Sequence, residues 1–324
     1  MSDLPKSVRI NEEGPREGFQ MEKGAIPTSR KIQLIDMLSQ TGLKHMQIVS
    51  FVNPKRVPGM ADAEQVVRGI TPQPGVEYEG LWLNEQGLER AAATGRLKLE
   101  GKISMFPSEK FLQRNQNRTV EQHLADLHRV LDTYKRMGIP VNRGSISSVF
   151  GCNFQGDIPL GKVLELVARI FEIAAEHEID IKVIQLADTM AWGVPQAVKR
   201  TVGAIREKYP DVRISLHLHD TRGMGIANAY AGLEMGVDMF DASVAGLGGC
   251  PFGAHQGAAG NVCTEDLVFM CEEMGIKTGI DLDALIACAQ TAEEIVGHPL
   301  PGSVKIGGSL QKLRAAHAGP ATQR

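Results

Sequence analysis

The chain has 324 residues, of which 43% are hydrophobic and 23% charged, and its formal net charge is −3. This composition suits a globular protein with a sizeable core, and without a long basic run it gives no support for binding nucleic acid or a membrane surface. The N-terminus lacks the apolar stretch of a secretion signal, and the five cysteines form no CxxC pair, so we expect a reduced, cytoplasmic protein.

Apolar segments of strand length alternate with longer segments of helical spacing from end to end. The expected strands are Val8–Glu12, Met46–Phe51, Tyr78–Leu83, Leu97–Met105, Val141–Val149, Ile181–Ala187, Val212–His219 and Val237–Val244. The expected helices cover Lys31–Leu38, Ala61–Ile70, Glu85–Thr94, Val120–Gly138, Leu160–His177, Val194–Tyr209 and Ile226–Gly236. Thr28 or Ser29 is placed to cap the first helix. Glycines suited to helix C-termini stand at Gly42, Gly95, Gly138 and Gly236.

Eight strands, each followed by a helix, predict an α/β protein of the (β/α)8 TIM-barrel class. A doubly wound open sheet is the alternative, but no Gly-x-Gly-x-x-Gly follows the first strand. Two further helices are expected at Thr264–Gly275 and Leu282–Val296. The barrel domain with these helices is assigned to residues 1–300. Residues 301–324 are assigned to a C-terminal tail, loosely ordered from Ala315 onward.

A barrel of this kind carries its chemistry at the C-terminal ends of the strands and in the loops that follow. Polar and ionisable residues gather at these ends in the sequence, whereas we expect the strand bodies to be apolar. The ends in question are Glu12–Gly18, Ser50–Lys55, Asp188–Thr189, His217–Asp220 and Gly246–Pro251.

The segment from Arg213 to Arg222 has the period of two that marks a strand, and it places His217 and His219 on one face. Two histidines at a strand end, followed by Asp220, can hold one metal ion from one side. The alternative is a half-buried strand with two hydrogen-bonded histidines.

Five stretches, in the expected order, resemble segments of the 3-hydroxy-3-methylglutaryl-CoA lyases, which belong to a superfamily of metal-dependent TIM-barrel aldol lyases and Claisen synthases. The most specific is Ser243–Phe252, similar to the lyase signature around a reactive loop cysteine. The others are Gly14–Gly18, Ile48–Lys55, Leu216–Thr221 and Gly260–Asp266. The resemblance implies a carbon–carbon lyase that acts on an acyl-CoA thioester, and a homodimer by family habit.

Three departures from the family pattern fall around the reaction centre. Glu17 stands where the family has aspartate, and Gln47 where it has glutamate. The segment from Cys250 to Asn261 is also longer than the usual spacing, around His255. These departures predict a lyase of the same mechanism whose preferred substrate can differ from 3-hydroxy-3-methylglutaryl-CoA.

The resemblance implies a divalent cation bound by Glu17, His217, His219 and Asn261. Because this set has oxygen and nitrogen ligands and no thiolate, we expect Mg²⁺ or Mn²⁺ rather than structural zinc. The alternatives for Glu17 are a surface carboxylate or a ligand that acts through water.

Cleavage between C2 and C3 requires removal of the hydroxyl proton, stabilisation of the enolate and its protonation. Arg16 is expected to stabilise the enolate oxygen, with a salt bridge to Glu13 or Asp188 as the alternative role. His217 could carry a proton as well as bind metal. Asp188 is expected to orient Arg16 or to accept a proton. Cys250, in a glycine-rich loop able to close over substrate, is expected to donate a proton; its alternative role is that of a small apolar turn residue.

Further residues are expected to bind substrate or support the site. Thr189 is placed to hydrogen-bond the substrate carboxylate. Gln47 lies among the substrate-binding residues but cannot act as an acid or base. Glu265 is expected to hold Asn261 or a neighbouring backbone group in place.

Coenzyme A contacts are harder to identify from the sequence. The segment with Ser108 and Arg114 resembles the family segment beside the thioester arm, although a solvated helix face explains Arg114 equally well. Asn53 and Lys55 are weaker candidates of the same kind.

Two other functions remain open. A synthase that condenses acetyl-CoA with a 2-oxo acid would use the same barrel and metal, but the cysteine loop favours a lyase and synthases usually carry additional C-terminal sequence. A non-catalytic barrel that binds an acyl-CoA or a partner is favoured only by Glu17 and Gln47. Within the lyases, another branched 3-hydroxydiacyl-CoA, such as citramalyl-CoA or a longer analogue, is an alternative substrate.

Overall fold

The computed structural model describes residues 4–22, 24–248 and 260–317. Its eight-stranded sheet is parallel throughout and follows the order β3-β2-β1-β10-β9-β8-β5-β4. Near the junction between the two end strands, the Lys98 amide donates to the Tyr78 carbonyl at 2.8 Å. The strands are β1 (Arg9–Glu12), β2 (His45–Ser50), β3 (Glu77–Leu81), β4 (Gly101–Met105), β5 (Val141–Ile146), β8 (Val183–Asp188), β9 (Arg213–Leu218) and β10 (Met239–Ala242). The TIM-barrel fold and all eight expected strands are confirmed.

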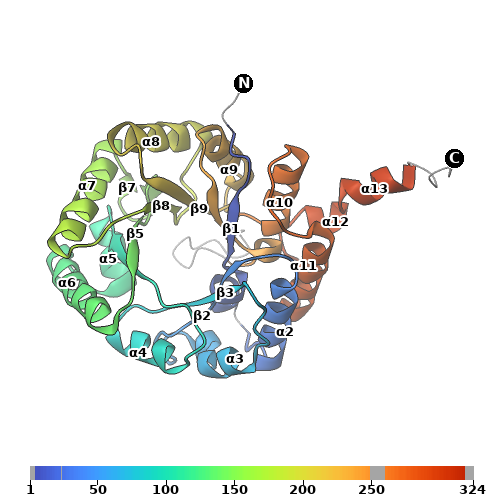
Figure 1. Cartoon of the computed structure of the whole chain (residues 1–324), viewed down its shortest axis with the longest axis horizontal. Coiled ribbons are helices and arrows are strands. Elements are labelled where there is room, and N and C mark those ends of the chain that lie inside the picture. Colours follow the sequence, from blue (N-terminus) through green and yellow to red (C-terminus); the bar gives the residue numbers. More distant parts are fainter. Residues whose placement is uncertain (1–3, 23, 249–259, 318–324) are drawn as a thin grey trace.

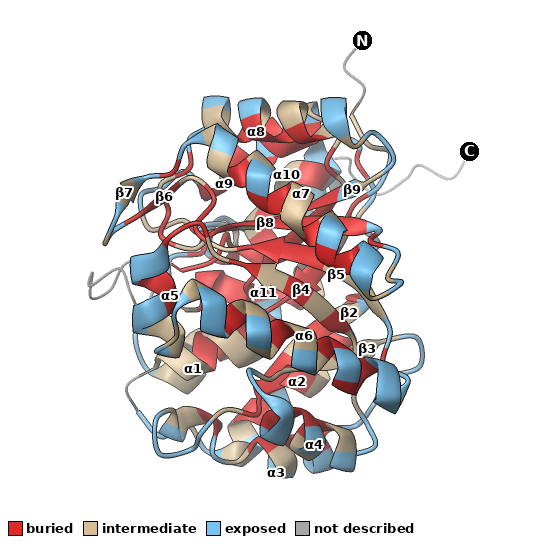
Figure 2. Ribbon diagram, turned by 90° about the vertical axis from the view of Figure 1, so that its left-hand side faces the viewer, coloured by how far each residue is buried: buried red, intermediate tan, exposed pale blue. Residues whose placement is uncertain are grey.

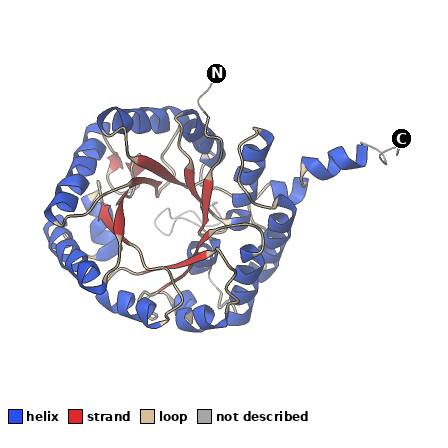
Figure 3. Ribbon diagram, viewed as in Figure 1, coloured by secondary structure: helices blue, strands red, loops and turns tan. Residues whose placement is uncertain are grey.

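Helices surround this sheet as an outer ring (Figures 1 and 3). Every expected helix is present, including the two after the last strand. The helices are α1 (Phe19–Met21), α2 (Thr28–Ser39), α3 (Ala63–Gly69), α4 (Glu85–Ala93), α5 (Glu109–Gln116), α6 (Val120–Met137), α7 (Leu160–Glu176), α8 (Pro195–Lys208), α9 (Gly225–Glu234), α10 (Thr264–Glu273), α11 (Leu282–Val296), α12 (Val304–Gly307) and α13 (Leu310–His317).

Local differences from the expected elements have simple causes. Helix α5 was not expected, because its only buried apolar side chains are Phe111 and Leu112. A small hairpin of β6 (Gly151–Cys152) and β7 (Gly156–Asp157) was also not expected. The expected cap of α2 is wrong, since its N-cap is Pro27 and the Thr28 hydroxyl instead donates to Asp62 at 2.7 Å. The expected helix-ending glycines all have positive φ, at Gly42, Gly95, Gly138 and Gly236.

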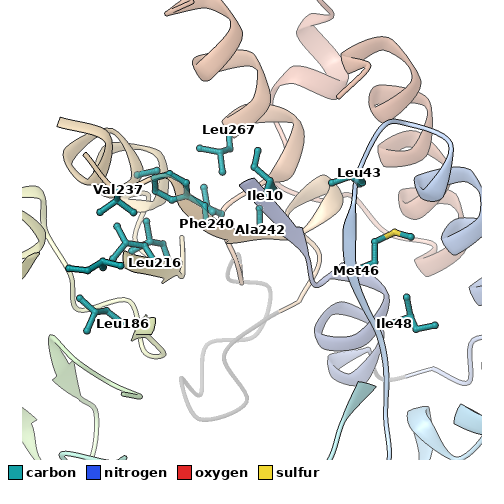
Figure 4. Close-up of a cluster of buried hydrophobic side chains, with 14 of the residues drawn as sticks. Ile10, Leu43, Met46, Ile48, Leu186, Leu216, Val237, Phe240, Ala242 and Leu267 are labelled. Carbon is teal, nitrogen blue, oxygen red and sulfur yellow. The ribbon is translucent and has the colours of Figure 1, made fainter. Parts of the chain in front are cut away.

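The apolar core lies between the outer face of the sheet and the helices. Figure 4 shows this layer, in which strand residues such as Ile10, Leu216 and Phe240 gather with Leu267 of α10. In Figure 2 most residues of the barrel strands are buried or intermediate, whereas the helices carry their exposed residues on the outside. Burial of this layer is the main stabilising contribution of the fold.

The inner face of the sheet differs from expectation. Alternate residues within the strand bodies are polar or charged and line a central cavity, so the prediction of apolar strand bodies is wrong for this face. These residues include Arg9, Asn11, His45, Gln47, Glu79, Lys102, Ser104, Arg143, Ser145, Gln185, His217 and Asp241.

The chain beyond residue 300 is partly packed onto the barrel. The backbone amides of Ser303 and Val304 donate to Asp266, and Lys305 is paired with Glu293. The ordered unit therefore extends past residue 300, into the segment assigned to the tail, and α13 projects from the ring (Figure 1). Among the described residues, no helix has both the length and the apolar character needed to cross a membrane.

Candidate metal and catalytic site

One turn of π-helix, Gly14–Gly18, follows β1 and carries two residues of the site, Arg16 and Glu17. The turn is fixed from below by Glu12, whose buried carboxylate accepts hydrogen bonds from the Gly14 amide at 2.7 Å and from the Val244 amide at 2.9 Å. The Thr264 hydroxyl donates to the same carboxylate at 2.6 Å. Glu12 thus joins the end of β1 to the segments that follow β10.

Three potential metal ligands converge at this end of the barrel. Glu17 Oε1 lies 3.1 Å from His219 Nε2, which in turn lies 3.1 Å from His217 Nε2. Glu17 Oε1 and His217 Nε2 are 3.8 Å apart. The three side chains come from the π-helical turn and from the end of β9. Their ligand atoms all lie within 4.8 Å of one another, a spacing that one cation could bridge.

Asn261 is held at the same end of the barrel by backbone pairing with His219. Residues 260–262 run beside the end of β9, where Asn261 pairs with His219 as an antiparallel bridge and the Val262 amide donates to the Leu218 carbonyl at 2.8 Å. Among the described residues, neither Oδ1 nor Nδ2 of the fully buried Asn261 side chain has a hydrogen-bond partner. A buried amide in this state is costly, and a ligand would satisfy it.

The donor set fits a divalent cation. It offers a carboxylate oxygen and two imidazole nitrogens that line the cavity, and Asn261 is joined to His219 by a backbone bridge. Mixed oxygen and nitrogen ligands without thiolate are typical of Mg²⁺, Mn²⁺ and related ions. Glu17, His217, His219 and Asn261, expected as ligands from the sequence, are therefore brought together at one end.

Arg16 is held between two carboxylates. Its Nη1 lies 3.0 Å from Glu17, and its Nη2 is paired with Glu13. Burial alone raises the pKa of Glu17, but the Arg16 guanidinium and the two imidazoles outweigh it and hold that pKa well below its usual range. Glu17 therefore stays ionised at pH values at which an ordinary glutamate takes up a proton. The ionised carboxylate is the form that binds a metal ion.

His217 is oriented by a buried polar network that sequence reasoning missed. Its Nδ1 lies 3.1 Å from Asp241 Oδ2, which also accepts from Gln185 Nε2 at 2.5 Å. Asn11 donates to the other Asp241 oxygen at 2.7 Å. Burial opposes protonation of His217, yet Glu17 and Asp241 raise its pKa to about 9. The signal in the sequence for this contact was Asp241 itself, an acidic residue on an otherwise apolar strand. The structure pairs Asp241 in register with His217.

Asp188 does not orient Arg16. Both of its oxygens accept backbone hydrogen bonds, from Trp192 at 2.8 Å and from Gly193 at 2.9 Å. Of the two salt bridges considered for Arg16, the structure shows the one to Glu13. Burial raises the pKa of Asp188, which leaves proton acceptance as its remaining proposed role.

The expected substrate-binding residues separate into two groups. Gln47 and Thr189 line the cavity, and the Thr189 hydroxyl accepts from the Ser148 amide at 3.0 Å. Asn53, Lys55 and Arg114 are exposed and do not line it.

Each residue outside the cavity has a local role. Asn53 accepts from the Lys55 amide at 2.9 Å, and the Arg114 guanidinium lies 4.4 Å from the centre of the Phe154 ring. Ser108 is fully buried and caps α5 by accepting from the Phe111 amide at 3.1 Å. None of Ser108, Asn53, Lys55 and Arg114 lines the cavity, and their contacts with coenzyme A stay a prediction.

Glu265 supports the backbone beside the site. It accepts from the Ala245 amide at 2.9 Å, which is the second of the two roles expected for it, and Ala245 has a φ of 58°. Burial raises the pKa of Glu265 to about 7. Cys250 and His255 lie outside the described residues.

A cavity of about 390 Å³ extends from the metal-ligand group into the barrel. Arg16, Glu17, His217 and His219 line it at the C-terminal end, and Lys102 and Arg143 line it deeper in the barrel. The cavity can therefore accept a polar substrate from the side of the candidate ligands.

Comparison with known proteins gives one consistent result. The family model described as HMGL-like matches residues 7–292. The chain is 42% identical over 285 residues to the mitochondrial hydroxymethylglutaryl-CoA lyase of Gallus gallus, covering 87% of this chain and 91% of that protein.

Solved structures agree with the sequence relatives. The HMG-CoA lyase of Bacillus subtilis superposes with a TM-score of 0.85 at 38% identity, covering 96% of this chain and 99% of that one. An HMG-CoA lyase of Acinetobacter baumannii, in complex with coenzyme A and 3-methylmalate, has a TM-score of 0.82 at 36% identity and covers 100% of this chain and 99% of that one.

Proposed function

This chain belongs to the HMGL-like family, and from that premise we propose that it cleaves a 3-hydroxy-3-methylglutaryl-CoA-like thioester to acetyl-CoA and an oxo acid, acetoacetate in the case of HMG-CoA itself. Its similarity to hydroxymethylglutaryl-CoA lyases and its match to the family model identify it as a carbon–carbon lyase. The observation that carries the proposal is the convergence of Arg16 with Glu17, His217 and His219 at one end of the barrel cavity.

Glu17, His217, His219 and the Asn261 amide would hold the divalent cation, for which we propose Mg²⁺ or Mn²⁺. When bound, such an ion supplies Lewis acidity that lowers the pKa of the substrate hydroxyl. Asp241 fixes the His217 ring so that Nε2 faces the other ligands, a supporting contact of the kind that tunes metal sites.

Arg16 stabilises the enolate that leaves as acetyl-CoA. Its guanidinium stays protonated, and the flanking Glu13 and Glu17 fix its position before substrate arrives. Donors fixed in advance around a developing charge supply a large part of catalysis. Asp188 or His217 would accept the hydroxyl proton, and Cys250 would return a proton to the enolate carbon.

The substrate can differ from HMG-CoA within the same mechanism. Gln47 lines the cavity without an acid or base function, and Glu17 extends one methylene further than aspartate. The A. baumannii relative was solved with 3-methylmalate, a methyl-branched hydroxy diacid. Thioesters of such diacids, citramalyl-CoA among them, are the alternative substrates.

We also propose a cytoplasmic homodimer. Relatives include cytoplasmic forms in mouse and rat as well as mitochondrial forms. Sedimentation of the purified protein would test the dimer.

The decisive experiment incubates the purified protein with HMG-CoA and Mn²⁺ and measures acetyl-CoA and acetoacetate by mass spectrometry. A panel of branched 3-hydroxydiacyl-CoA thioesters, and acetyl-CoA with 2-oxo acids, would be run in parallel. We expect cleavage of at least one thioester and its loss with a chelator. Condensation without cleavage would identify a synthase, and a protein that takes up no Mn²⁺ and cleaves nothing would be a binding barrel. Glu17→Asp should retain metal, as measured by calorimetry.

A further inference from the structure

Two cations face each other in the barrel interior, below the metal-ligand group. Lys102 of β4 and Arg143 of β5 are paired in register, so their side chains leave the sheet on the same face. Both line the cavity. Like charges directly opposite each other in a sheet are destabilising, so this pair requires compensation.

Within the part of the chain that the structure describes, neither side chain forms an ion pair. The charges of Glu79 and Asp241 act on Arg143, and those of Glu13 and Asp241 on Lys102, only from beyond 4.0 Å. Among the described residues, no carboxylate oxygen lies within 4.0 Å of Lys102 or Arg143, including those of Glu79, which lines the same cavity from β3. By contrast Lys98, four positions before Lys102, is bound to Glu77 at 2.7 Å and to Glu100 at 3.1 Å. Burial and the neighbouring Arg143 charge lower the pKa of Lys102, whereas Glu13 acts in the opposite direction.

The pair lies one layer below the reaction centre. One layer up the same two strands, Ser104 faces Ser145, and the Ser145 hydroxyl donates to Gln185, which donates in turn to the His217 partner Asp241. Two residues along a strand correspond to about 7 Å. The long Lys102 side chain can therefore reach up from its layer toward a molecule held at the metal-ligand group.

We propose that Lys102, with Arg143 beside it, binds the free carboxylate at the distal end of the substrate and so makes the enzyme selective for thioesters of diacids. This inference rests on the proposed lyase function and adds the residue that selects its substrate class. A charge-assisted hydrogen bond from a buried ammonium to a carboxylate is strong, and the bound anion also relieves the repulsion between the two cations.

The test compares two substrates in four proteins. HMG-CoA is assayed against the same thioester with its distal carboxylate converted to a neutral carboxamide. The proteins are the wild type, Lys102→Met, Lys102→Arg and the control Lys98→Met, which removes a lysine already bound by two carboxylates. Binding of the free diacid 3-hydroxy-3-methylglutarate is measured by calorimetry with and without Mn²⁺, and inorganic phosphate is titrated as a competing anion. Thermal unfolding establishes that each variant is folded.

We expect the wild type to prefer the carboxylate thioester by about 10- to 100-fold in kcat/KM, the range of one charge-assisted hydrogen bond. Lys102→Met should abolish that preference, mainly through KM, and weaken diacid binding by a similar factor. Lys102→Arg should restore part of both, and Lys98→Met should change neither.

Several outcomes would overturn the assignment. An equal loss for both substrates in Lys102→Met would mean that Lys102 acts through Glu13 or Asp241 instead. Displacement of the diacid by phosphate at equal concentration would indicate a general anion site. If the wild type cleaved no thioester but bound the diacid through Lys102, the lyase proposal would fail and the carboxylate site would stand. Absence of Lys102-dependent diacid binding would remove the site itself.

Discussion

Neighbouring residues of β9 and β10 have opposite surroundings. Leu216 and Phe240 point outward and are fully buried against the helices. His217 and Asp241, the next residues along, point inward and line the cavity. The outer face stabilises the barrel by apolar burial, whereas the inner face positions charges for chemistry. One strand can do both because successive side chains leave a sheet on opposite sides.

The two faces also differ in what holds them. Outer residues need only shape and hydrophobicity, because dispersion and burial are not directional. Inner residues are charged and must be matched one by one, as Asp241 is by Asn11, Gln185 and His217. Such networks often stabilise less than apolar packing of the same volume would, so the inner face is a functional rather than a stabilising arrangement.

Phe240→Ala tests this division on the outer face and has the largest expected effect. Loss of a fully buried phenyl ring should lower the free energy of unfolding by about 3–5 kcal/mol. Urea denaturation measures that change. Because the ring points away from the cavity, kcat of the folded fraction should stay near that of the wild type. A variant that keeps its stability but loses turnover would contradict the division.

Arg16→Gln tests the inner face. Loss of the guanidinium should lower kcat by about 100- to 1,000-fold, the range seen when one donor to a developing oxyanion is removed. Mn²⁺ stoichiometry should change little. Arg169→Gln, which removes an exposed arginine paired with Glu172, is the matched control. Near-normal turnover in Arg16→Gln would show that the enolate assignment is wrong.

The sequence predicted the outer face of the barrel well. Apolar period-two segments located all eight strands to within a few residues, because burial against helices requires such segments. The strand-end rule then placed Arg16, Glu17, His217 and His219 at one end, where the structure has them.

The inner face was less predictable for physical reasons. Asp241, Gln185 and Lys102 are single polar residues within short strands, and a polar residue alone does not reveal whether it faces a cavity or solvent. The direction in which such a residue points depends on how its strand pairs with strands that are distant in the chain. The register of Lys102 with Arg143 is an example. Asp188 was assigned to Arg16 from its place at a strand end, but the nearer amides of Trp192 and Gly193 take its carboxylate.

Asp241→Asn tests whether the inner network acts on the metal site. Asparagine places an NH2 group where one carboxylate oxygen accepts hydrogen bonds, so His217 should lose its fixed orientation. We expect Mn²⁺ affinity to fall by about 10- to 100-fold, the usual loss when the partner of a metal-bound histidine is changed. Calorimetry measures it, with Asp238→Asn, a surface acid paired with Arg213, as the control. Unchanged Mn²⁺ affinity would show that the hydrogen bonds of Asp241 support the packing of the barrel interior and do not act on the metal site.

Glu12→Gln has the smallest expected effect when it is counted per pH unit, and it tests the buried carboxylate that joins the end of β1 to the segments after β10. Burial raises the pKa of Glu12 from 4.5 to about 8, despite its three hydrogen bonds. Between these pH values the folded protein keeps a proton that the unfolded chain has lost. The stabilisation is therefore complete below pH 4.5 and falls as the pH rises toward 8.

Glutamine cannot titrate, so the variant should show a shallower decline in stability across this range. The difference in slope is at most about 1.4 kcal/mol per pH unit, the value for one proton. Urea denaturation of both proteins from pH 5 to pH 8, in steps of about 0.5 pH unit, measures this difference in slope. Glu265, whose pKa of about 7 has the same sign, remains in the variant and keeps part of the slope. If the wild type and Glu12→Gln instead showed the same slope over this range, Glu12 would be ionised in the fold throughout it, and its three donors would outweigh the cost of burying its charge.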